Sequence, residues 1–203
     1  MNYNELASEQ SLQDTKQALE SNGFNVQIVD TAEDAKNAAR NLIPKGSEVM
    51  TMTSMSLTAL GLDEEFNNNE AYKPVRDKLY SLDSETQGVE KLKLGAAPEY
   101  TIGSVHAVTT DGKVLVASNT GSQMPAYVYG SAHVVWIVGA QKIVKDLDEG
   151  IKRIYDYVLP LESERAHKAY GVEASFVSKL LIFNREVNSQ RINIILVKEQ
   201  LGF

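Results

Sequence analysis

Residues 24–62, FNVQIVDTAEDAKNAARNLIPKGSEVMTMTSMSLTALGL, decide the fold, because apolar runs alternate in them with helical patterns. FNVQIVD (24–30) alternates apolar and polar side chains, which is typical of a strand. TAED (31–34) resembles a capping box and predicts the start of a helix. SEVMTMT (47–53) is the next predicted strand, and it breaks into a short helix near Ser56. This order of strand, helix, strand and helix predicts a parallel sheet with helices on its faces.

The pattern continues on both sides of this stretch. Residues 5–22 predict an N-terminal helix that stops at Gly23. YTIGSVHAVT (100–109) and TDGKVLVAS (110–118) predict a hairpin, because Asp-Gly between apolar runs is a turn signal. VVWIVG (134–139) is a continuous apolar run, as expected of a buried central strand.

The last quarter of the chain predicts one or two helices and then two strands. A helix begins at Asp146, and we expect Pro160 to end it, with a charged helix following up to Gly171. SKLLIFNREV (178–187) and RINIILVKE (191–199) are the final predicted strands. We therefore predict a single α/β domain over residues 1–203. It is a three-layer sandwich around a mostly parallel, mixed central sheet, with a helical segment (1–22) packed on it.

Composition excludes several classes of function. The net charge is -7 and no block of lysine or arginine is present, so nucleic-acid binding is not expected. The chain has no cysteine, which excludes disulfides, thiolate nucleophiles and cysteine-bound iron–sulfur clusters within it. No apolar run reaches the roughly 20 residues that span a bilayer. The three histidines lack metal-ligand spacing. We expect a cytoplasmic protein without membrane insertion, metal or cofactor.

Three polar loops follow predicted strands, and ligands in open α/β sheets bind at the carboxyl ends of strands. Their neutral donors and one lysine suit a small anion such as a carboxylate, phosphate or acyl group. The candidate ligand-binding residues are Ser54, Ser56, Asn119, Thr120, Gly121, Ser122, Gln123, Gln141 and Lys142. The competing interpretations are a serine that only caps a helix, an ordinary capped turn and a solvated lysine.

Catalytic candidates are fewer. His106 stands in a predicted strand from which its side chain can point into a cleft, and Glu99 and Asp111 are carboxylates near the same hairpin, so each is a candidate base. No nucleophile elbow, phosphate-binding loop or dinucleotide fingerprint occurs in the sequence. Whether the chain is an enzyme therefore stays open at this point.

Four segments together resemble the LUD domain, the lactate-utilisation family once described as a domain of unknown function. The resemblance covers residues 8–203. The segments are TSMSLTALGL (53–62), IGSVHAVTTDGKVLVASNTGSQMPAYVYGSAHVVWIVGAQKIV (102–144), LDEGIKRIYDYVLPLESERAHKAYG (147–171) and RINIILVKEQLGF (191–203). One departure is Thr110-Asp111-Gly112, where many lactate-operon members have Glu-Thr-Gly.

The resemblance implies the fold shared by glucosamine-6-phosphate deaminase, ribose-5-phosphate isomerase and CoA transferases. It also implies a link to systems that oxidise L-lactate to pyruvate, whose iron–sulfur subunits would here be separate partners. We expect an accessory, small-anion-binding component of lactate or other organic-acid utilisation that is not itself a redox carrier. The alternatives are an enzyme resembling sugar-phosphate isomerases or acyl (CoA) transferases, and a scaffold for iron–sulfur oxidoreductase subunits.

Overall fold

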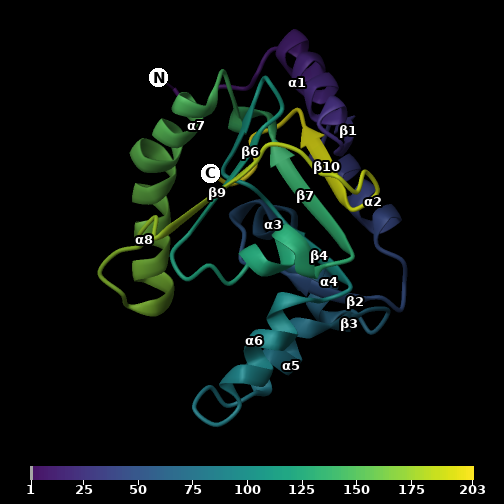
Figure 1. Ribbon diagram of the computed structural model, residues 1–203, viewed down its shortest axis with the longest axis vertical. Helices are drawn as coiled ribbons and strands as arrows, with labels where there is room; N and C mark the ends of the chain where they lie inside the picture. Colours follow the sequence, from purple (N-terminus) through teal and green to yellow (C-terminus); the bar gives the residue numbers. More distant parts are fainter. Residues whose placement is uncertain (1) are drawn as a thin grey trace.

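The computed structural model describes residues 2–203 and contains two sheets (Figure 1). The central sheet has six strands in the order β1-β10-β7-β4-β2-β3, and every pairing in it is parallel. Its strands are β1 (Asn25–Val29), β2 (Glu48–Thr51), β3 (Lys73–Pro74), β4 (Tyr100–Gly103), β7 (His133–Gly139) and β10 (Ile192–Val197). The predicted α/β fold with a mostly parallel central sheet is confirmed.

β7 lies at the middle of this sheet, as its apolar sequence predicts. Val134 to Val138 are all fully buried, because β10 and β4 flank the strand and both faces of the sheet are covered. Trp136 pairs with Ile194 on one side and with Gly103 on the other. Since the strands run parallel, β2, β4, β7 and β10 all present their carboxyl ends at one edge.

Most of the hairpin predicted at residues 100–118 lies outside the central sheet, and only its first residues form β4. A second sheet has the order β8-β5-β6-β9, with β5 and β6 antiparallel. Its strands are β5 (Ala107–Thr109), β6 (Val114–Ser118), β8 (Ile143–Val144) and β9 (Lys179–Phe183). The first predicted strand of the hairpin is divided, because β4 ends at Gly103 and the chain then crosses to β5. The antiparallel pairing therefore belongs to this second sheet.

Three clusters of buried apolar side chains lie between the successive layers of the molecule. One face of the central sheet packs on α2, α3 and α4, and the other packs on α1 and the second sheet. The outer face of the second sheet packs on α7 and the helical turn that follows it. Figure 1 shows α1 and α2 at one side of the sheets, α7 and α8 at the other, and α5 and α6 projecting away from both.

The predicted helices at residues 5–22, after Thr31, near Ser56 and from Asp146 are present. The polar segment 63–72, which its sequence favours as a surface excursion, instead begins with a helix that buries Phe66. The helices of the structure have definite bounds. They are α1 (Glu9–Ser21), α2 (Ala32–Leu42), α3 (Met55–Leu60), α4 (Leu62–Asn68), α5 (Val75–Ser81), α6 (Gly88–Ala96), α7 (Leu147–Arg153) and α8 (Leu159–Tyr170). The expectation that Pro160 ends a helix is wrong. α7 continues through η3 (Ile154–Val158), a π-helical turn, directly into α8. Pro160 therefore stands within a continuous helical segment, directly after the π-helical turn that interrupts the regular hydrogen-bond pattern.

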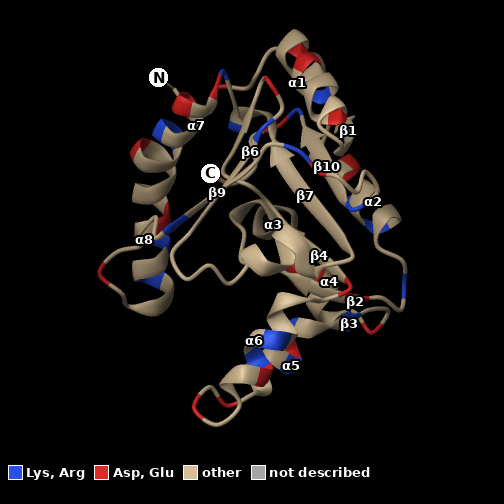
Figure 2. Ribbon diagram, in the orientation of Figure 1, with Lys and Arg blue, Asp and Glu red and all other residues tan. Residues whose placement is uncertain are grey.

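Two further short turns connect strands of different sheets. η1 (Ala126–Gly130) is π-helical, and η2 (Ala140–Lys142) is a single 3₁₀ turn that joins β7 to β8. The Lys, Arg, Asp and Glu residues lie mainly on the helices and loops, and β7 contains none of them (Figure 2). Among residues 2–203, no helix is long and apolar enough to cross a membrane.

Candidate functional site

A cleft of about 1400 Å³ opens at the carboxyl edge of the central sheet. Its floor is formed where β2, β4 and β7 end and the chain turns toward the second sheet. We call the floor the six residues Met52, Ser104, Val105, His106, Tyr127 and Lys142. Its walls come from α5, α6, α8, the segment after α8 and the polar loop after β6. The cleft thus lies where ligands bind in open α/β sheets.

Lys142 is the central side chain of the floor. It stands in η2, directly after β7, and only 2% of its surface is exposed. Its Nζ lies 3.0 Å from Ser56 Oγ, 3.1 Å from Ser104 Oγ and 3.2 Å from the carbonyl oxygen of Val105. The lysine therefore ties together the chain segments that follow three parallel strands.

Within residues 2–203, no carboxylate forms an ion pair with the charge of Lys142. All three of its hydrogen-bond partners are neutral oxygens. Burial, with a smaller contribution from the guanidinium of Arg153, lowers the pKa of its amine to about 7. Near neutral pH the amine therefore exchanges between a charged form, which attracts an anion, and a neutral form, which accepts a proton.

Ser56 and Ser104 differ in access to the cleft. Ser56 is 1% exposed and lies behind the floor, where its hydroxyl contacts the carbonyl oxygen of Leu201 at 3.0 Å. Ser104 lines the cleft and donates to the carbonyl oxygen of Ile137 at 2.7 Å. The two hydroxyl oxygens are 3.2 Å apart. Sequence reasoning named Ser56 and missed Ser104, although Ser104 directly follows the glycine that interrupts its strand.

His106 presents a neutral donor to the floor. Its Nδ1 accepts a hydrogen bond from the backbone N–H of Ala117 at 3.1 Å, so the ring proton is on Nε2. Within residues 2–203, the side-chain hydrogen bond of His106 is the one at Nδ1, and the residue lines the cleft. Burial and the nearby cations Lys142 and Arg153 lower the pKa of His106 to about 3. At neutral pH this histidine therefore acts as a hydrogen-bond donor.

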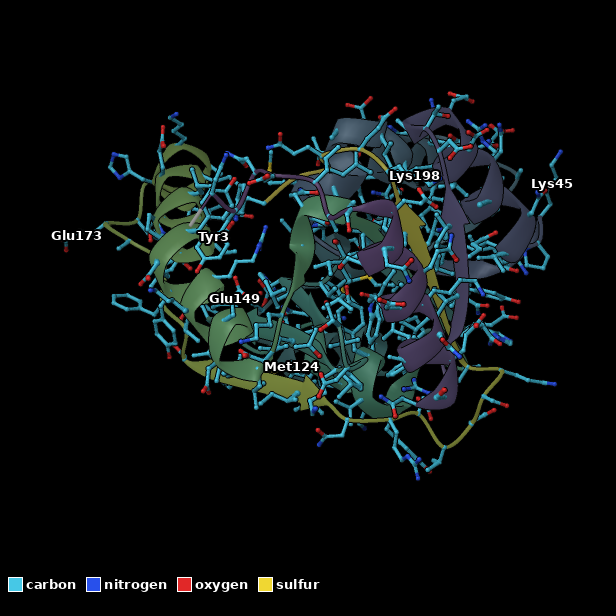
Figure 3. The ribbon with its side chains drawn as sticks, turned by 90° about the horizontal axis from the view of Figure 1, so that it is seen from above. Tyr3, Lys45, Met124, Glu149, Glu173 and Lys198 are labelled. Carbon is cyan, nitrogen blue, oxygen red and sulfur yellow. The ribbon has the colours of Figure 1, made fainter. Side chains whose placement is uncertain are left out.

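Arg153 adds a second buried cation behind the floor. Its side chain is fully buried in α7 and donates to the carbonyl oxygen of His106. Within the part of the chain described, its Nε and Nη2 have no hydrogen-bond partner. The rings of Tyr157 and Tyr3 lie 5.2 and 6.0 Å from its guanidinium carbon. Figure 3 shows Tyr3 beside the α7–α8 helical segment. Burial lowers the pKa of Arg153 to about 10, so it stays charged at neutral pH.

The loop Asn119–Gln123 lines one wall of the cleft but satisfies most of its own polar groups. Ser118 Oγ accepts from the N–H of Gly121 at 2.8 Å and contacts Gln123 Oε1 at 2.9 Å. Thr120 Oγ1 accepts from the N–H of Ser122 at 3.3 Å. Within residues 2–203, the side-chain groups of the loop without a recorded partner are Asn119 Nδ2 and Ser122 Oγ. The loop can therefore offer a ligand a few neutral contacts.

Two opposite walls of the cleft carry large exposed apolar or aromatic side chains. Tyr80 and Leu92 come from the α5–α6 projection and are 64% and 75% exposed. Tyr170 and Phe176 come from the opposite wall and are 64% and 63% exposed. α5 and α6 thus face the segment around α8 across the cleft. Such walls suit a ligand that is larger than a small acid and partly apolar.

Two further residues predicted to bind a ligand, Ser54 and Gln141, lie outside the floor. Ser54 lines the cleft and caps α3, since its Oγ accepts from the N–H of Leu57 at 3.4 Å. Gln141 is 2% exposed and holds the C-terminal segment through the carbonyl oxygens of Leu201 and Gly202, both at 3.1 Å. Its side chain therefore anchors the C-terminal segment.

The two carboxylates considered as bases lie outside the cleft. Glu99 precedes β4 at the opposite edge of the sheet, where it accepts from the N–H of Glu48 at 3.2 Å. Asp111 is exposed in the β5–β6 turn and pairs with Lys113. Within residues 2–203, no group of three or more His, Asp or Glu side chains is arranged to hold a metal ion.

Comparison with known proteins agrees with the resemblance seen in the sequence. A crystal structure of a DUF162 family protein from Deinococcus radiodurans matches at a TM-score of 0.57 and 12% identity, covering 95% of this chain and 99% of that one. Ribose 5-phosphate isomerase from Plasmodium falciparum gives a TM-score of 0.35 at 12% identity, over 66% of each chain. No curated protein matches the sequence. A family model described as LUD domain matches residues 12–197, so the chain belongs to the LUD domain family and is, at that level, related to lactate utilisation.

Proposed function

We propose that this protein binds a small organic acid on the floor of the cleft, as an accessory component of lactate or other organic-acid utilisation. The observation that carries the proposal is Lys142, a buried amine at the cleft floor whose hydrogen-bond partners are all neutral. A buried cation without a carboxylate partner is costly, and a ligand carboxylate lowers that cost. Family membership suggests the chemical class of the acid.

The other floor residues support the same ligand. The N–H of His106 Nε2 is a donor without a recorded partner in the described chain, and Arg153 adds positive charge behind the ring. Asn119 and Ser122 add neutral contacts from the wall. Because a bound anion favours the ammonium form of Lys142, we expect its pKa to rise when the ligand binds. Binding should therefore weaken as pH increases above 7.

The absence of cysteine limits this role. The chain has none, so it cannot hold cysteine-bound iron–sulfur clusters. If lactate is oxidised in the system it serves, the electrons pass through separate partner subunits. The protein would then bind or deliver the acid, and it would not carry the electrons.

Calorimetry tests the proposal directly. The titrants are L-lactate, pyruvate, inorganic phosphate and a neutral amide analogue of lactate, each at pH 6 and pH 8. We expect the carboxylates to bind and the amide to bind at least about 10-fold more weakly, because a charge-assisted hydrogen bond contributes about 1.5–3 kcal/mol. The folded protein failing to bind any anion would refute the proposal.

A pair of lysine variants locates the binding. Lys142→Met removes the buried amine, whereas Lys145→Met removes an amine that is 85% exposed three residues later. Both variants replace one lysine by the same apolar residue. We expect Lys142→Met alone to abolish binding, and an equal loss in both variants would point to a general charge effect.

A further inference from the structure

We propose that Ser104 is a nucleophile and Lys142 its general base, and that the floor of the cleft transfers or hydrolyses the acyl group of a carboxylic ester or thioester. The inference rests on the proposed function, because the acyl group occupies the place assigned to the acid. It adds a reaction and a substrate class to that site.

The two side chains have the geometry of a nucleophile and its base. Lys142 Nζ lies 3.1 Å from Ser104 Oγ, within the hydrogen-bond distance required for proton transfer. Ser104 lines the cleft and so is open to a substrate. Its hydroxyl hydrogen is directed to the carbonyl oxygen of Ile137, and rotation about the Cβ–Oγ bond turns it toward the amine.

The amine is able to accept the proton. Its contacts are two hydroxyls and one carbonyl oxygen, and none of them is a carboxylate that would hold it protonated. Burial lowers its pKa to about 7, which is close to the value at which a general base is most effective near neutral pH. A surface lysine would be almost fully protonated there.

The surrounding chain holds both groups in place. Tyr127 is buried and donates its hydroxyl to the carbonyl oxygen of Ser104 at 3.3 Å. Gly103 permits this contact, because a Cβ at that position would lie 1.9 Å from the Tyr127 hydroxyl oxygen. Ser56, behind the floor, contacts both Lys142 and Ser104. A site held in this way loses little entropy when the reaction occurs.

The reaction needs only the ester or thioester and a second substrate, which is water or an acceptor alcohol or thiol. Ser104 Oγ attacks the acyl carbon and its proton passes to Lys142 Nζ. The bond from the acyl carbon to the leaving oxygen or sulfur breaks, and the leaving group takes the proton from Lys142 as an alcohol or thiol. Water, or an acceptor alcohol or thiol, then attacks the acyl-serine and gives its proton to Lys142. The acid or the new ester leaves, Ser104 regains the proton, and both side chains are restored.

Two other features fit an ester or thioester substrate. The N–H of His106 Nε2 is a neutral donor at the same floor, suited to the oxygen that becomes negative during attack. The cleft has a volume of about 1400 Å³, more than the ~300–1,000 Å³ typical of ligand pockets, so a three-carbon acid fills little of it. The exposed side chains of Tyr80, Leu92 and Phe176 leave room for an apolar acyl chain or a bulky leaving group.

The test uses p-nitrophenyl esters of acetate, butyrate and octanoate with the full-length protein. Release of p-nitrophenol is followed together with the intact mass, and the modified peptide is mapped after a brief reaction. We expect one acyl group on Ser104 and a rate that rises with pH through about 7. Ser104→Ala and Lys142→Met should each lower the rate about 100-fold or more.

Ser21→Ala is the matched control. Ser21 is exposed at the end of α1, outside the lining of the cleft, and its Oγ donates to the carbonyl oxygen of Gln17 at 2.8 Å. Its loss should leave the rate unchanged. Peptide mapping of the wild-type protein keeps the test valid even if a floor variant does not fold.

The outcomes separate this inference from the proposed function. Acylation of Ser104 supports the inference whether or not lactate binds. Lactate binding without acylation by any ester overturns the inference and leaves the binding proposal standing. An acyl group found on Lys142 or on surface lysines instead of Ser104 also overturns it.

Discussion

The floor of the cleft and the loop Asn119–Gln123 both follow strands, yet they differ in what they leave for a ligand. The loop is rich in Ser, Thr, Asn and Gly, but most of its polar groups bond to each other. The floor contains few polar residues, but its amine is buried and bonds to segments that follow three different strands. In the part of the chain that the structure describes, these partners are neutral oxygens and no carboxylate pairs with the amine. A loop rich in small polar residues is therefore weak evidence for a ligand site, because such residues also stabilise turns. A buried amine without an ionic partner is stronger evidence for a functional site.

The largest expected difference between the two regions is in the dependence of stability on pH. The pKa of Lys142 is about 7 in the folded chain and 10.5 without burial. Between these values the unfolded chain holds a proton that the folded chain has released, so the free energy of unfolding increases with pH. The slope from this one group is about 1.4 kcal/mol per pH unit.

Urea unfolding of the wild type and of Lys142→Met at pH 7, 8, 9 and 10 measures this slope. The free energy of unfolding of the wild type should increase relative to that of the variant at each increase in pH. Parallel curves would show that Lys142 is solvated in the folded protein, and the distinction between floor and loop would then fail. A loop variant such as Ser122→Ala should keep the wild-type slope.

His106 gives a second pH effect, at acid pH. Its pKa is about 3 in the folded chain and 6.5 without burial, so the unfolded chain binds a proton between these values and the folded chain does not. Stability should therefore fall as pH decreases from 6.5 toward 3, again by about 1.4 kcal/mol per pH unit. His106→Asn keeps an acceptor for the N–H of Ala117 and removes the titration.

The measurement for His106 is thermal unfolding in buffers from pH 6.5 to 4. The difference between the wild type and His106→Asn should narrow or reverse as the pH is lowered. A constant difference would mean that the ring is protonated as easily in the folded protein as in the unfolded chain, and its proposed role as a neutral donor would be lost.

Substitutions at two glycines test how tightly the floor and the loop Asn119–Gln123 are packed. A Cβ at Gly103 would lie 1.9 Å from the Tyr127 hydroxyl and 3.1 Å from Met52 Cβ, both in the floor. A Cβ at Gly121 would lie 2.7 Å from Cδ of Lys179, a flexible side chain that can move away, although the φ of +85° there adds strain. We expect Gly103→Ala to lower stability by about 1–3 kcal/mol or more, and Gly121→Ala by about 1–2 kcal/mol.

Binding of the acid distinguishes these two variants further. Gly103→Ala should also weaken binding of the acid, because the chain at Ser104 must shift. Gly121→Ala should leave binding within a few-fold of the wild type once the loss of stability is accounted for. Calorimetry at a temperature where both variants are folded measures these affinities. If both variants lost the same affinity, the floor and the loop would not differ in their importance for binding.

The sequence predicts the fold better than it predicts the site. The apolar run 134–139 and the alternation in residues 24–62 are enough to predict a parallel sheet. They thereby predict the strand-end edge at which ligands bind in open α/β folds generally. Lys142 could be named because it follows the most apolar strand. Ser104 could not, because only the strand order β7-β4-β2 brings it beside that lysine.

Gln141 and Lys142 illustrate the same limit. They are neighbours and both are 2% exposed, yet one side chain holds the C-terminal segment while the other reaches the cleft. The single 3₁₀ turn of η2 directs them to different partners, and nothing in the composition of Gly-Ala-Gln-Lys predicts which residue faces which way. Arg153 likewise approaches His106 only because α7 packs on the second sheet.

The smallest expected effect concerns the loop itself. Asn119 Nδ2 and Ser122 Oγ are its groups without a recorded partner in the described chain, and a neutral hydrogen bond contributes about 0.5–1.5 kcal/mol. Asn119→Ala and Ser122→Ala should therefore weaken acid binding by only about 2- to 10-fold each, measured by the calorimetry used for Lys142→Met. Thr110→Ala, in the distant hairpin turn, is the control and should bind as the wild type does. A loop variant that abolished binding would reverse the comparison, because the ligand would then be held by the wall and the buried amine would serve only to join the strand ends.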